Sequence, residues 1–436
     1  MDRRRRLKLN RRQRQCQRFP QLHRICLFFL LGVSVLLQIL LITRTEHRSE
    51  NDLPPHKNHL NAASSTQHGK HNDENEKNSA TTTKSRPPRL FSVFSTECSP
   101  FHDWHAQSLI HNHKKQGIQG FLVRLMACDD PSYILPKHSY EKYRVVRLPN
   151  FGLRGGDNWS VRNKPFSVAY WLGGFSKDDD LPEDDDIVAS IDPDMLFLSS
   201  DVNLGSIKEN HGVASQYSLG NEWVTRDWVL KLCDGKCDVI ADPSDVSFGA
   251  PYILRAKDML RLARLWKSLV DEMRPYDKSW HLDMYAAIIA ARRLDIVFTV
   301  ERGMIGNPID DMEPWDLTTW GGSSSDIGKL HSHDPLTMQV VHYCQTYSIS
   351  SYSWGKHDYH NLDIRKCDPL NNAFNLPTSG DSILMTETRG KELAPMTDVA
   401  TTARNVWLLD ATMAVAHEAI ERYNSEFCVP LEHTKT

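Results

Sequence analysis

Most of the chain alternates between short apolar runs rich in β-branched and aromatic residues and longer segments with helical periodicity. Strands separated by helices form a mostly parallel sheet with helices on both of its faces. The alternation therefore predicts an α/β domain. The strands expected in its first half cover residues 90–96, 120–128, 143–149 and 186–191, and the helices 104–117 and 163–175.

The second half of the chain continues the same plan. Further strands are expected at residues 212–218, 247–254 and 295–301, and helices at 257–274 and 279–294. A connector of loop-like composition, roughly 355–395, leads to one long amphipathic helix at 398–427. The sequence shows no internal repeat.

The N-terminal region predicts a membrane anchor. Residues 2–24 carry nine Arg and one Lys against one Asp, and residues 25–43 are 19 residues without a charge. At about 1.5 Å per residue, such a helix spans the roughly 30 Å hydrocarbon core. A cleaved signal peptide is the alternative, but its apolar part would be about 7–15 residues and would end in small residues. The basic flank places the N-terminus in the cytosol and everything after Arg44 in the lumen.

These segments give a domain organisation. Residues 44–88 are polar without an apolar period, so they are expected to form a disordered lumenal stem. The net charge of −3 over 436 residues does not indicate a nucleic-acid-binding protein. The predicted parts are a cytosolic tail at 1–24, an anchor at 25–43, the stem at 44–88, a catalytic domain at 89–360, and a C-terminal connector with its helix at 361–436.

The cysteines point to disulfides. A lumenal domain permits them, and "CDGKC", Cys233 to Cys237, is the best local pair because an Asp-Gly turn closes it. A zinc site fits less well, since no second Cys or His pair follows at finger spacing. Seven cysteines lie in the expected lumenal part, so at least one stays outside intrachain pairs. Asn158 begins the one N-glycosylation acceptor sequence.

Three Asp-x-Asp patterns lie close together, at 178–180, 184–186 and 192–194. Asp192 follows an apolar strand directly, so it lies at the carboxyl edge of the sheet, where α/β proteins bind ligands. The upstream run precedes that strand and is expected to be a solvated surface loop. Asp192 and Asp194 are therefore the candidate metal ligands.

Two carboxylates with one residue between them have a specific use. On an extended chain their side chains point the same way. They can share a hard divalent cation that still has room for diphosphate oxygens. Such a cation neutralises the charge that develops on a leaving nucleoside diphosphate.

Longer segments resemble a known family. They are "FSTECSPFHDWHAQSLIHNHKK", "RNKPFSVAYWL", "IDPDMLFL", "FGAPYILRAKDMLRLARLW", "WHLDMYAAIIAA", "PWD" and "VVHYC", in this order. The set, spread over roughly 91–356, resembles the peptidyl hydroxyproline O-arabinosyltransferases and the related peptidyl serine α-galactosyltransferases. The resemblance implies a Golgi glycosyltransferase of the GT-A fold, with a single-pass type II anchor and a lumenal catalytic domain.

The resemblance also implies roles for single residues. Asp192 and Asp194 match the metal-binding pair, and His342 matches the distant histidine that completes the metal shell. Imidazole suits manganese, although His342 taken alone would be read as a core histidine. The donor-binding positions that match are Asn163, Lys164 and Lys356. Lys356 alone would be an ordinary surface lysine, and the other two also suit the start of a helix.

Asp283 stands where the family usually has Glu, in the motif W-x-x-E-M-Y. Its neighbours Trp280, Met284 and Tyr285 are large and apolar, so a partly buried carboxylate is expected. The resemblance places it beside the transferred sugar and the acceptor hydroxyl. Asp283 is therefore the candidate catalytic residue.

The function expected from the sequence is a retaining, metal-dependent glycosyltransferase that uses a UDP-sugar and Mn²⁺ or another divalent cation. Its acceptor is a hydroxyproline- or serine-containing protein. Hydroxyproline O-arabinosylation is the first hypothesis, and serine α-galactosylation is the alternative. A covalent route through Asp283 remains open. A lumenal binding protein without turnover is a further alternative, against which the intact Asp192, Asp194 and His342 count.

Overall fold

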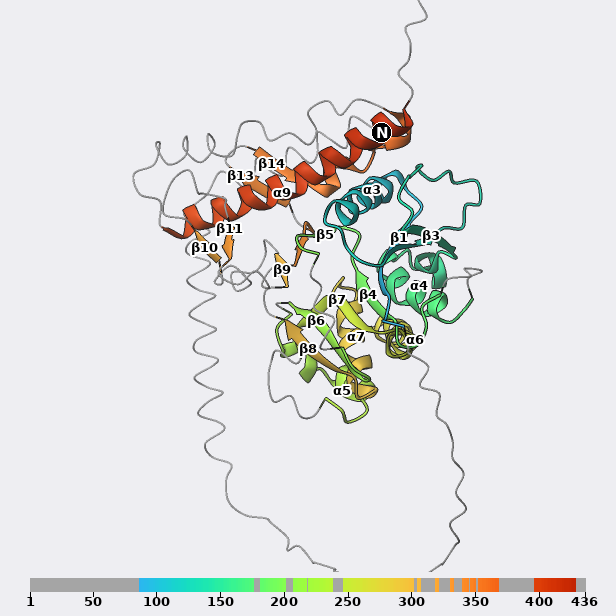
Figure 1. Cartoon of the computed structure of the whole chain (residues 1–436). Helices are drawn as coiled ribbons and strands as arrows, with labels where there is room; N and C mark the ends of the chain where they lie inside the picture. The colour runs from blue at the N-terminus through green and yellow to red at the C-terminus, as the bar shows by residue number, and fades with distance from the viewer. Residues whose placement is uncertain are drawn as a thin grey trace, which may run out of the picture. The chain divides into compact units, whose positions relative to one another are not determined.

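The computed structural model divides the chain into residues 1–82 and 83–436, and all described residues belong to the second unit (Figure 1). Among them, no helix combines the length and apolar character needed to cross a bilayer. The predicted tail and anchor, and the stem up to residue 85, lie outside the described residues. The structure describes residues 86–175, 181–200, 207–217, 219–237, 246–301, 304–306, 318–320, 330–332, 339–344, 346–349, 352–367 and 396–428.

A seven-stranded sheet in the order β3-β2-β1-β4-β7-β6-β8 forms the centre of the domain. β7 runs antiparallel to both of its neighbours, β4 and β6, and the other pairs are parallel. The predicted α/β class with a mostly parallel sheet is confirmed. Its strands are β1 (Leu90–Glu97), β2 (Phe121–Ala127), β3 (Tyr143–Leu148), β4 (Ile187–Ile191), β6 (His211–Gln216), β7 (Phe248–Arg255) and β8 (Val297–Glu301).

Helices cover both faces of this sheet. Alternate side chains of β1 point to opposite sides, so this strand contacts a helix on each face. Phe91 packs its ring 6.1 Å from Trp171 of α4, whereas Thr96 accepts a hydrogen bond from Arg124, which also binds Asp103 of α3. The C-terminal helix α9 lies alongside α3 (Figure 1). The helices are α3 (Pro100–Lys115), α4 (Asn163–Leu172), α5 (Asp227–Leu232), α6 (Ala256–Met273), α7 (Leu282–Arg293) and α9 (Met396–Phe427).

Short strands add a second layer next to the main sheet. β5 (Met195–Phe197), β12 (Val340–His342) and β9 (Ile305–Gly306) form one small sheet. A second core of buried side chains joins this layer to α3 and α9, and includes Trp104, Tyr343 and Leu409. The remaining short strands are β10 (Thr318–Trp320), β11 (Leu330–Ser332), β13 (Thr346–Ile349) and β14 (Tyr352–Gly355).

The end of the chain agrees in part with expectation. The long helix predicted at 398–427 is confirmed as α9. The connector expected to be loop-like begins instead with two short 3₁₀ helices, η6 (Lys356–Tyr359) and η7 (Ile364–Lys366). Residues 368–395 of that connector lie outside the described part of the chain.

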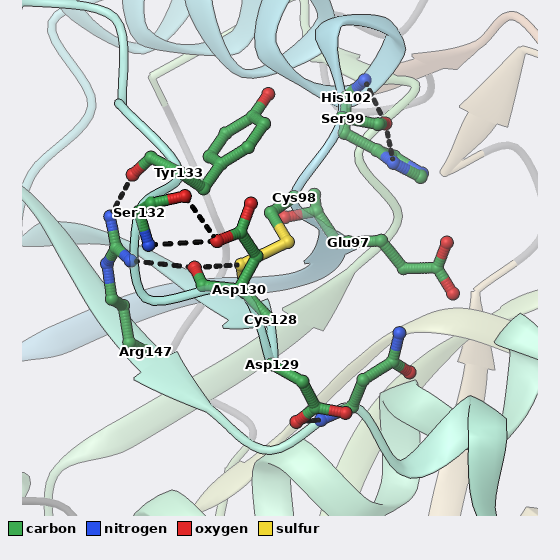
Figure 2. The surroundings of a disulfide bond; sticks show 12 residues. Glu97, Cys98, Ser99, His102, Cys128, Asp129, Asp130, Ser132, Tyr133 and Arg147 are labelled. Atoms are coloured by element: carbon green, nitrogen blue, oxygen red, sulfur yellow. Dashed lines mark hydrogen bonds between the residues drawn. A yellow bond between two sulfur atoms is a disulfide. The ribbon is translucent and has the colours of Figure 1, made fainter.

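Three disulfides are present among the described cysteines. The predicted local pair Cys233–Cys237 is confirmed. Cys367–Cys428 joins the segment after η7 to the end of α9, and Cys98–Cys128 joins the ends of β1 and β2. Figure 2 shows the last of these, with the Glu97 side chain directed away from Asp130 and Arg147. Cys344 lies outside these three pairs, as the odd number of cysteines predicts.

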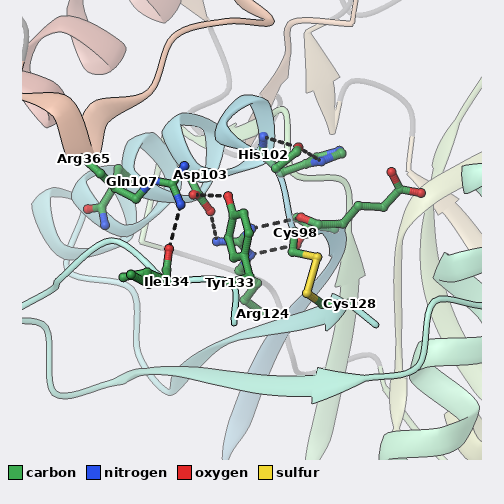
Figure 3. A network of polar contacts seen from close by, with 12 residues as sticks. Cys98, His102, Asp103, Gln107, Arg124, Cys128, Tyr133, Ile134 and Arg365 are labelled. Atoms are coloured by element: carbon green, nitrogen blue, oxygen red, sulfur yellow. Dashed lines mark hydrogen bonds and ion pairs between the residues drawn. A yellow bond between two sulfur atoms is a disulfide. The ribbon is translucent and has the colours of Figure 1, made fainter. Parts of the chain in front are cut away.

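A buried polar network lies beside the Cys98–Cys128 disulfide (Figure 3). Arg124 of β2 donates to Asp103 of α3 over 2.8 Å, and Tyr133 donates to the second oxygen of Asp103 over 2.6 Å. The guanidinium of Arg365 stacks over the Tyr133 ring. The network therefore ties the sheet, α3 and η7 together next to the edge at which β1 ends.

The upstream acidic run is not a wholly solvated loop, which corrects the prediction. Asp186 is 1% exposed and accepts hydrogen bonds from Arg86, Arg89 and the Glu183 main chain. Burial by itself would raise the pKa of Asp186, but hydrogen bonds from Arg86 and Arg89 hold it well below its usual range. Asp184 and Asp185 are exposed, as expected. Residues 178–180 lie outside the described residues.

Candidate active site

The carboxyl edge of the sheet carries the candidate metal ligands. β4 ends at Ile191, and Asp192, Pro193 and Asp194 form the turn that leads into β5. The main-chain N–H of Met195 donates to the Asp192 carbonyl over 3.1 Å and closes this turn. Both aspartates line a cavity of about 520 Å³.

Strand pairing brings His342 to the same place. β12 runs antiparallel to β5, and the register sets His342 opposite Met195. The Tyr343 N–H also donates to the Asp194 carbonyl over 3.0 Å. As a result, His342 Nε2 lies 3.3 Å from Asp194 Oδ1 and 4.0 Å from Asp192 Oδ2.

The three side chains suit a divalent cation. One ligand atom of each lies within 4.8 Å of the others, and two carboxylates with one imidazole are a donor set that manganese accepts. The hydroxyl of Tyr217 lies 3.1 Å from His342 Nδ1. When the neutral imidazole carries its proton on Nδ1, Nδ1 donates to the Tyr217 oxygen and the lone pair of Nε2 faces the carboxylates, as in other metal sites.

Lysine side chains compensate the charge of the aspartates. Lys356 Nζ is in hydrogen-bond contact with Asp194 Oδ2, and Lys164 Nζ lies 2.7 Å from Asp192 Oδ1. Burial by itself would raise the pKa of Asp194, but the charges of Lys356 and His342 hold it well below its usual range. The cavity therefore offers ionised carboxylates for a cation and ammonium groups for an anion.

Asp283 lies in the first turn of α7 and is 3% exposed. Its Oδ2 forms an ion pair with Lys164 Nζ over 3.0 Å, and apart from this ion pair no hydrogen bond from the described residues reaches that oxygen. Burial raises the pKa of Asp283, and the charge of Lys164 opposes this rise. A carboxylate oxygen has two lone pairs, so Oδ2 keeps an acceptor position for a bound hydroxyl in addition to its contact with Lys164.

The three large apolar neighbours of Asp283 differ in burial. Met284 and Tyr285 are buried, whereas Trp280 is 53% exposed. Trp280 precedes α7, and its ring packs on the ring of His281 instead of the core. The main chain at Asp283 is held by α6, where Trp266 Nε1 donates to the Asp283 carbonyl over 2.7 Å.

Asn163 is the first residue of α4 but does not cap the helix. Its Oδ1 accepts from the Gly152 N–H over 2.9 Å, and its Nδ2 donates to Glu97 and Asn150 over 3.1 Å. The Asn163 side chain therefore joins the loop after β3 to the end of β1. Asn163 lines the same cavity as Lys164 and Lys356.

Two residues that we did not predict also lie at this edge. Glu97 is the last residue of β1 and Tyr217 follows the last residue of β6, and both line the cavity. Burial raises the pKa of Glu97, although a hydrogen bond from Asn163 lowers it. The rule that located Asp192, a polar residue at the carboxyl end of a strand, could have found both.

Gly249 in β7 permits this arrangement. A Cβ at this position would lie 2.7 Å from ring carbons of Tyr217 and 2.9 Å from Met284 Sδ. Such a contact would push the Tyr217 ring away from His342 or displace the Met284 side chain at the start of α7.

A larger cavity of about 1120 Å³ lies along the edge strand β3, and Arg144 and Arg147 are among its lining residues. Within the described part of the chain, the candidate metal cluster lies in the smaller cavity at the carboxyl edge. That cavity holds all seven residues that the sequence singled out.

Known proteins share features with this chain. The peptidyl serine alpha-galactosyltransferase of Arabidopsis thaliana is 25% identical over 289 residues, which are 64% of this chain and 33% of that protein. The resemblance to this glycosyltransferase family is confirmed. The chain thus spans about one third of the length of the curated relative it matches.

Other comparisons add little. No family model matches the chain. Among solved structures, the galactosyltransferase LgtC in complex with donor and acceptor sugar analogs is 14% identical, with a TM-score of 0.36. The match covers 63% of this chain and 95% of that one, and at this TM-score the likeness is too slight to carry an argument.

Proposed function

We propose that the chain is a retaining, metal-dependent glycosyltransferase of the GT-A type that transfers a sugar from a UDP-sugar to a protein hydroxyl. One observation carries the proposal. A three-residue cation site, two lysines and a buried carboxylate meet in one cavity at the carboxyl edge of an α/β sheet. We assign hydroxyproline as the acceptor and arabinose as the sugar.

Donor binding is assigned to one group of side chains. Asp192, Asp194 and His342 would hold Mn²⁺ or another divalent cation, which when bound neutralises charge on the diphosphate. Lys356, beside Asp194, would bind diphosphate oxygens and stabilise the negative charge of the departing UDP. Asn163 and Lys164 would hold the sugar end of the donor.

Asp283 is assigned to the chemical step. Its Oδ2, which lies beside Lys164, would accept a hydrogen bond from a hydroxyl of the sugar or the acceptor and hold it in position. The acceptor oxygen then bonds to the anomeric carbon while the bond from that carbon to the UDP oxygen breaks. The acceptor proton leaves with the departing diphosphate oxygen, on the same face, so the configuration is retained.

Serine α-galactosylation is the second candidate, and the curated relative favours it. That relative is by name a peptidyl serine alpha-galactosyltransferase. The two candidates share the donor site and differ in the sugar and in the acceptor side chain.

The cellular place of the reaction belongs to the proposal. We assign residues 1–24 to the cytosol, 25–43 to a Golgi membrane anchor, 44–88 to a stem, and the catalytic domain at 89–360 to the lumen. The basic residues before an uncharged run support this orientation.

The test measures UDP release by the purified chain with manganese, each of the two UDP-sugars and matched hydroxyproline and serine peptides. We expect transfer from the arabinose donor to the hydroxyproline peptide, and loss of transfer when a chelator removes the metal. An Asp194→Asn variant serves as the inactive control. Absence of sugar transfer to either peptide from either donor would overturn the proposal.

A further inference from the structure

Trp280 has an unusual environment for a large aromatic side chain. It is 53% exposed, whereas the tryptophans at 104, 171, 223, 266 and 354 are fully buried. Exposing an indole to water is unfavourable, because the free energy falls when apolar area is removed from water. An exposed aromatic side chain at the border of a polar cavity is typical of a binding site.

The position of Trp280 links it to the chemistry. It lines the cavity together with Lys164, Asp192 and Asp283, and stands three residues before Asp283. The ring centroids of Trp280 and His281 are 3.9 Å apart, so one side of the indole is supported by the imidazole.

The segment that carries Trp280 is held in place by an ion pair. Asp277 accepts a hydrogen bond from the Ser279 N–H over 2.7 Å and is paired with Arg226 at 2.9 Å. Trp280 therefore extends from an anchored turn, which lowers the entropic cost of using it as a contact surface.

We propose that Trp280 is a specificity-determining residue that stacks on the ring of the acceptor residue and sets its hydroxyl beside Asp283. This inference rests on the proposed function and selects hydroxyproline over serine. A pyrrolidine ring has a broad apolar face that can cover an indole, whereas serine offers a single methylene group. The metal ligands and Lys356 account for the diphosphate of the donor, and the position of Trp280 three residues before Asp283 in the same cavity favours a contact with the acceptor.

The test compares the wild-type chain with Trp280→Ala and Trp280→Phe. Tyr276→Ala is the matched control, because Tyr276 is 64% exposed on the same turn and stacks on Trp228 outside the cavity lining. Two acceptor peptides differ only in hydroxyproline or serine at the acceptor position. Steady-state kinetics gives kcat and KM, and calorimetry gives the affinity for UDP with manganese and for each peptide.

We expect the wild-type chain to prefer the hydroxyproline peptide. Trp280→Ala should raise the KM and Kd for that peptide by about tenfold, as for loss of one aromatic stacking contact. The constants for the serine peptide should change by less than about twofold, and UDP affinity should stay unchanged. Trp280→Phe should recover most of the loss, and Tyr276→Ala should behave as wild type.

Several results would overturn the inference. They are a wild-type preference for serine, equal effects of Trp280→Ala on both peptides, and a loss of UDP affinity that would assign the indole to the donor base. If the wild type transfers sugar normally and Trp280→Ala matches Tyr276→Ala, the inference alone fails. If the wild type transfers to neither peptide, the proposed function fails and the inference fails with it.

Discussion

Lys164 Nζ lies 3.0 Å from Asp283 Oδ2 and thereby connects the candidate catalytic carboxylate to the candidate metal site. The same ammonium group lies 2.7 Å from Asp192 Oδ1. Burial by itself would lower the pKa of Lys164, but the charges of Asp192 and Asp283 raise it. One cation thus compensates two carboxylates from different elements. Because Asp283 is assigned to the chemical step, a substitution there should change turnover.

Asp283→Asn keeps the size of the side chain and removes its charge. We expect turnover to fall by about a hundredfold or more, as for loss of a positioned charged group, with little change in UDP affinity. Single-turnover kinetics together with calorimetry for UDP would measure both quantities. Full turnover in this variant would remove Asp283 from the mechanism.

Asp283→Glu restores the residue that the family usually carries and lengthens the side chain by one methylene. Because Asp283 is buried against Lys164, the longer side chain should displace its carboxylate. We expect turnover with the native acceptor to fall by about tenfold. Unchanged turnover would mean that the shorter side chain has no functional meaning.

Asp194→Asn should abolish transfer and the manganese-dependent part of UDP binding, because the site loses an ionised ligand. The upstream Asp184→Asn is a matched control, since Asp184 is exposed and precedes β4. Calorimetric titration of UDP with and without manganese would detect the change. If Asp194→Asn kept normal transfer and Asp184→Asn abolished it, our assignment of the Asp-x-Asp pairs would be reversed.

Asp186→Ala should lower stability without acting on the donor site. The substitution removes the common hydrogen-bond partner of Arg86 and Arg89. Loss of one partner of a buried pair costs about 3–5 kcal/mol, and the partly exposed arginines place the expected value at or below the lower end. Urea unfolding would measure it, and a wild-type midpoint would refute the structural role.

His113 should make the fold sensitive to acid. Burial lowers the pKa of His113 to about 4, with a smaller effect of Lys142, whereas an unfolded chain has a histidine pKa of about 6.5. The unfolded state therefore binds the extra proton first, so this stability is present above pH ~6.5 and is lost as pH falls towards 4. We expect a loss of about 2 kcal/mol at pH 5 from urea unfolding. His113→Gln should flatten this pH dependence, and an equal slope in both proteins would contradict the assignment.

The sequence alone determined much of the local structure. Runs of apolar residues located the strands of the main sheet, because each such run must be covered on both faces. The position of Asp192 followed from the same signal, since a polar residue directly after a buried strand lies at its carboxyl edge. Likewise, the Asp-Gly turn between Cys233 and Cys237 identified a disulfide whose partners are near neighbours.

Tertiary structure decided the contacts between distant segments. His342 faces Asp194 because β12 pairs with β5 in one register, which no local pattern reports. Asp186 is buried because Arg86 and Arg89 reach it from before β1, and the Trp280 ring is exposed because it packs on the His281 ring instead of the core. Periodicity shows which face of an element is apolar. Which element covers that face depends on the pairing of residues far apart in the chain.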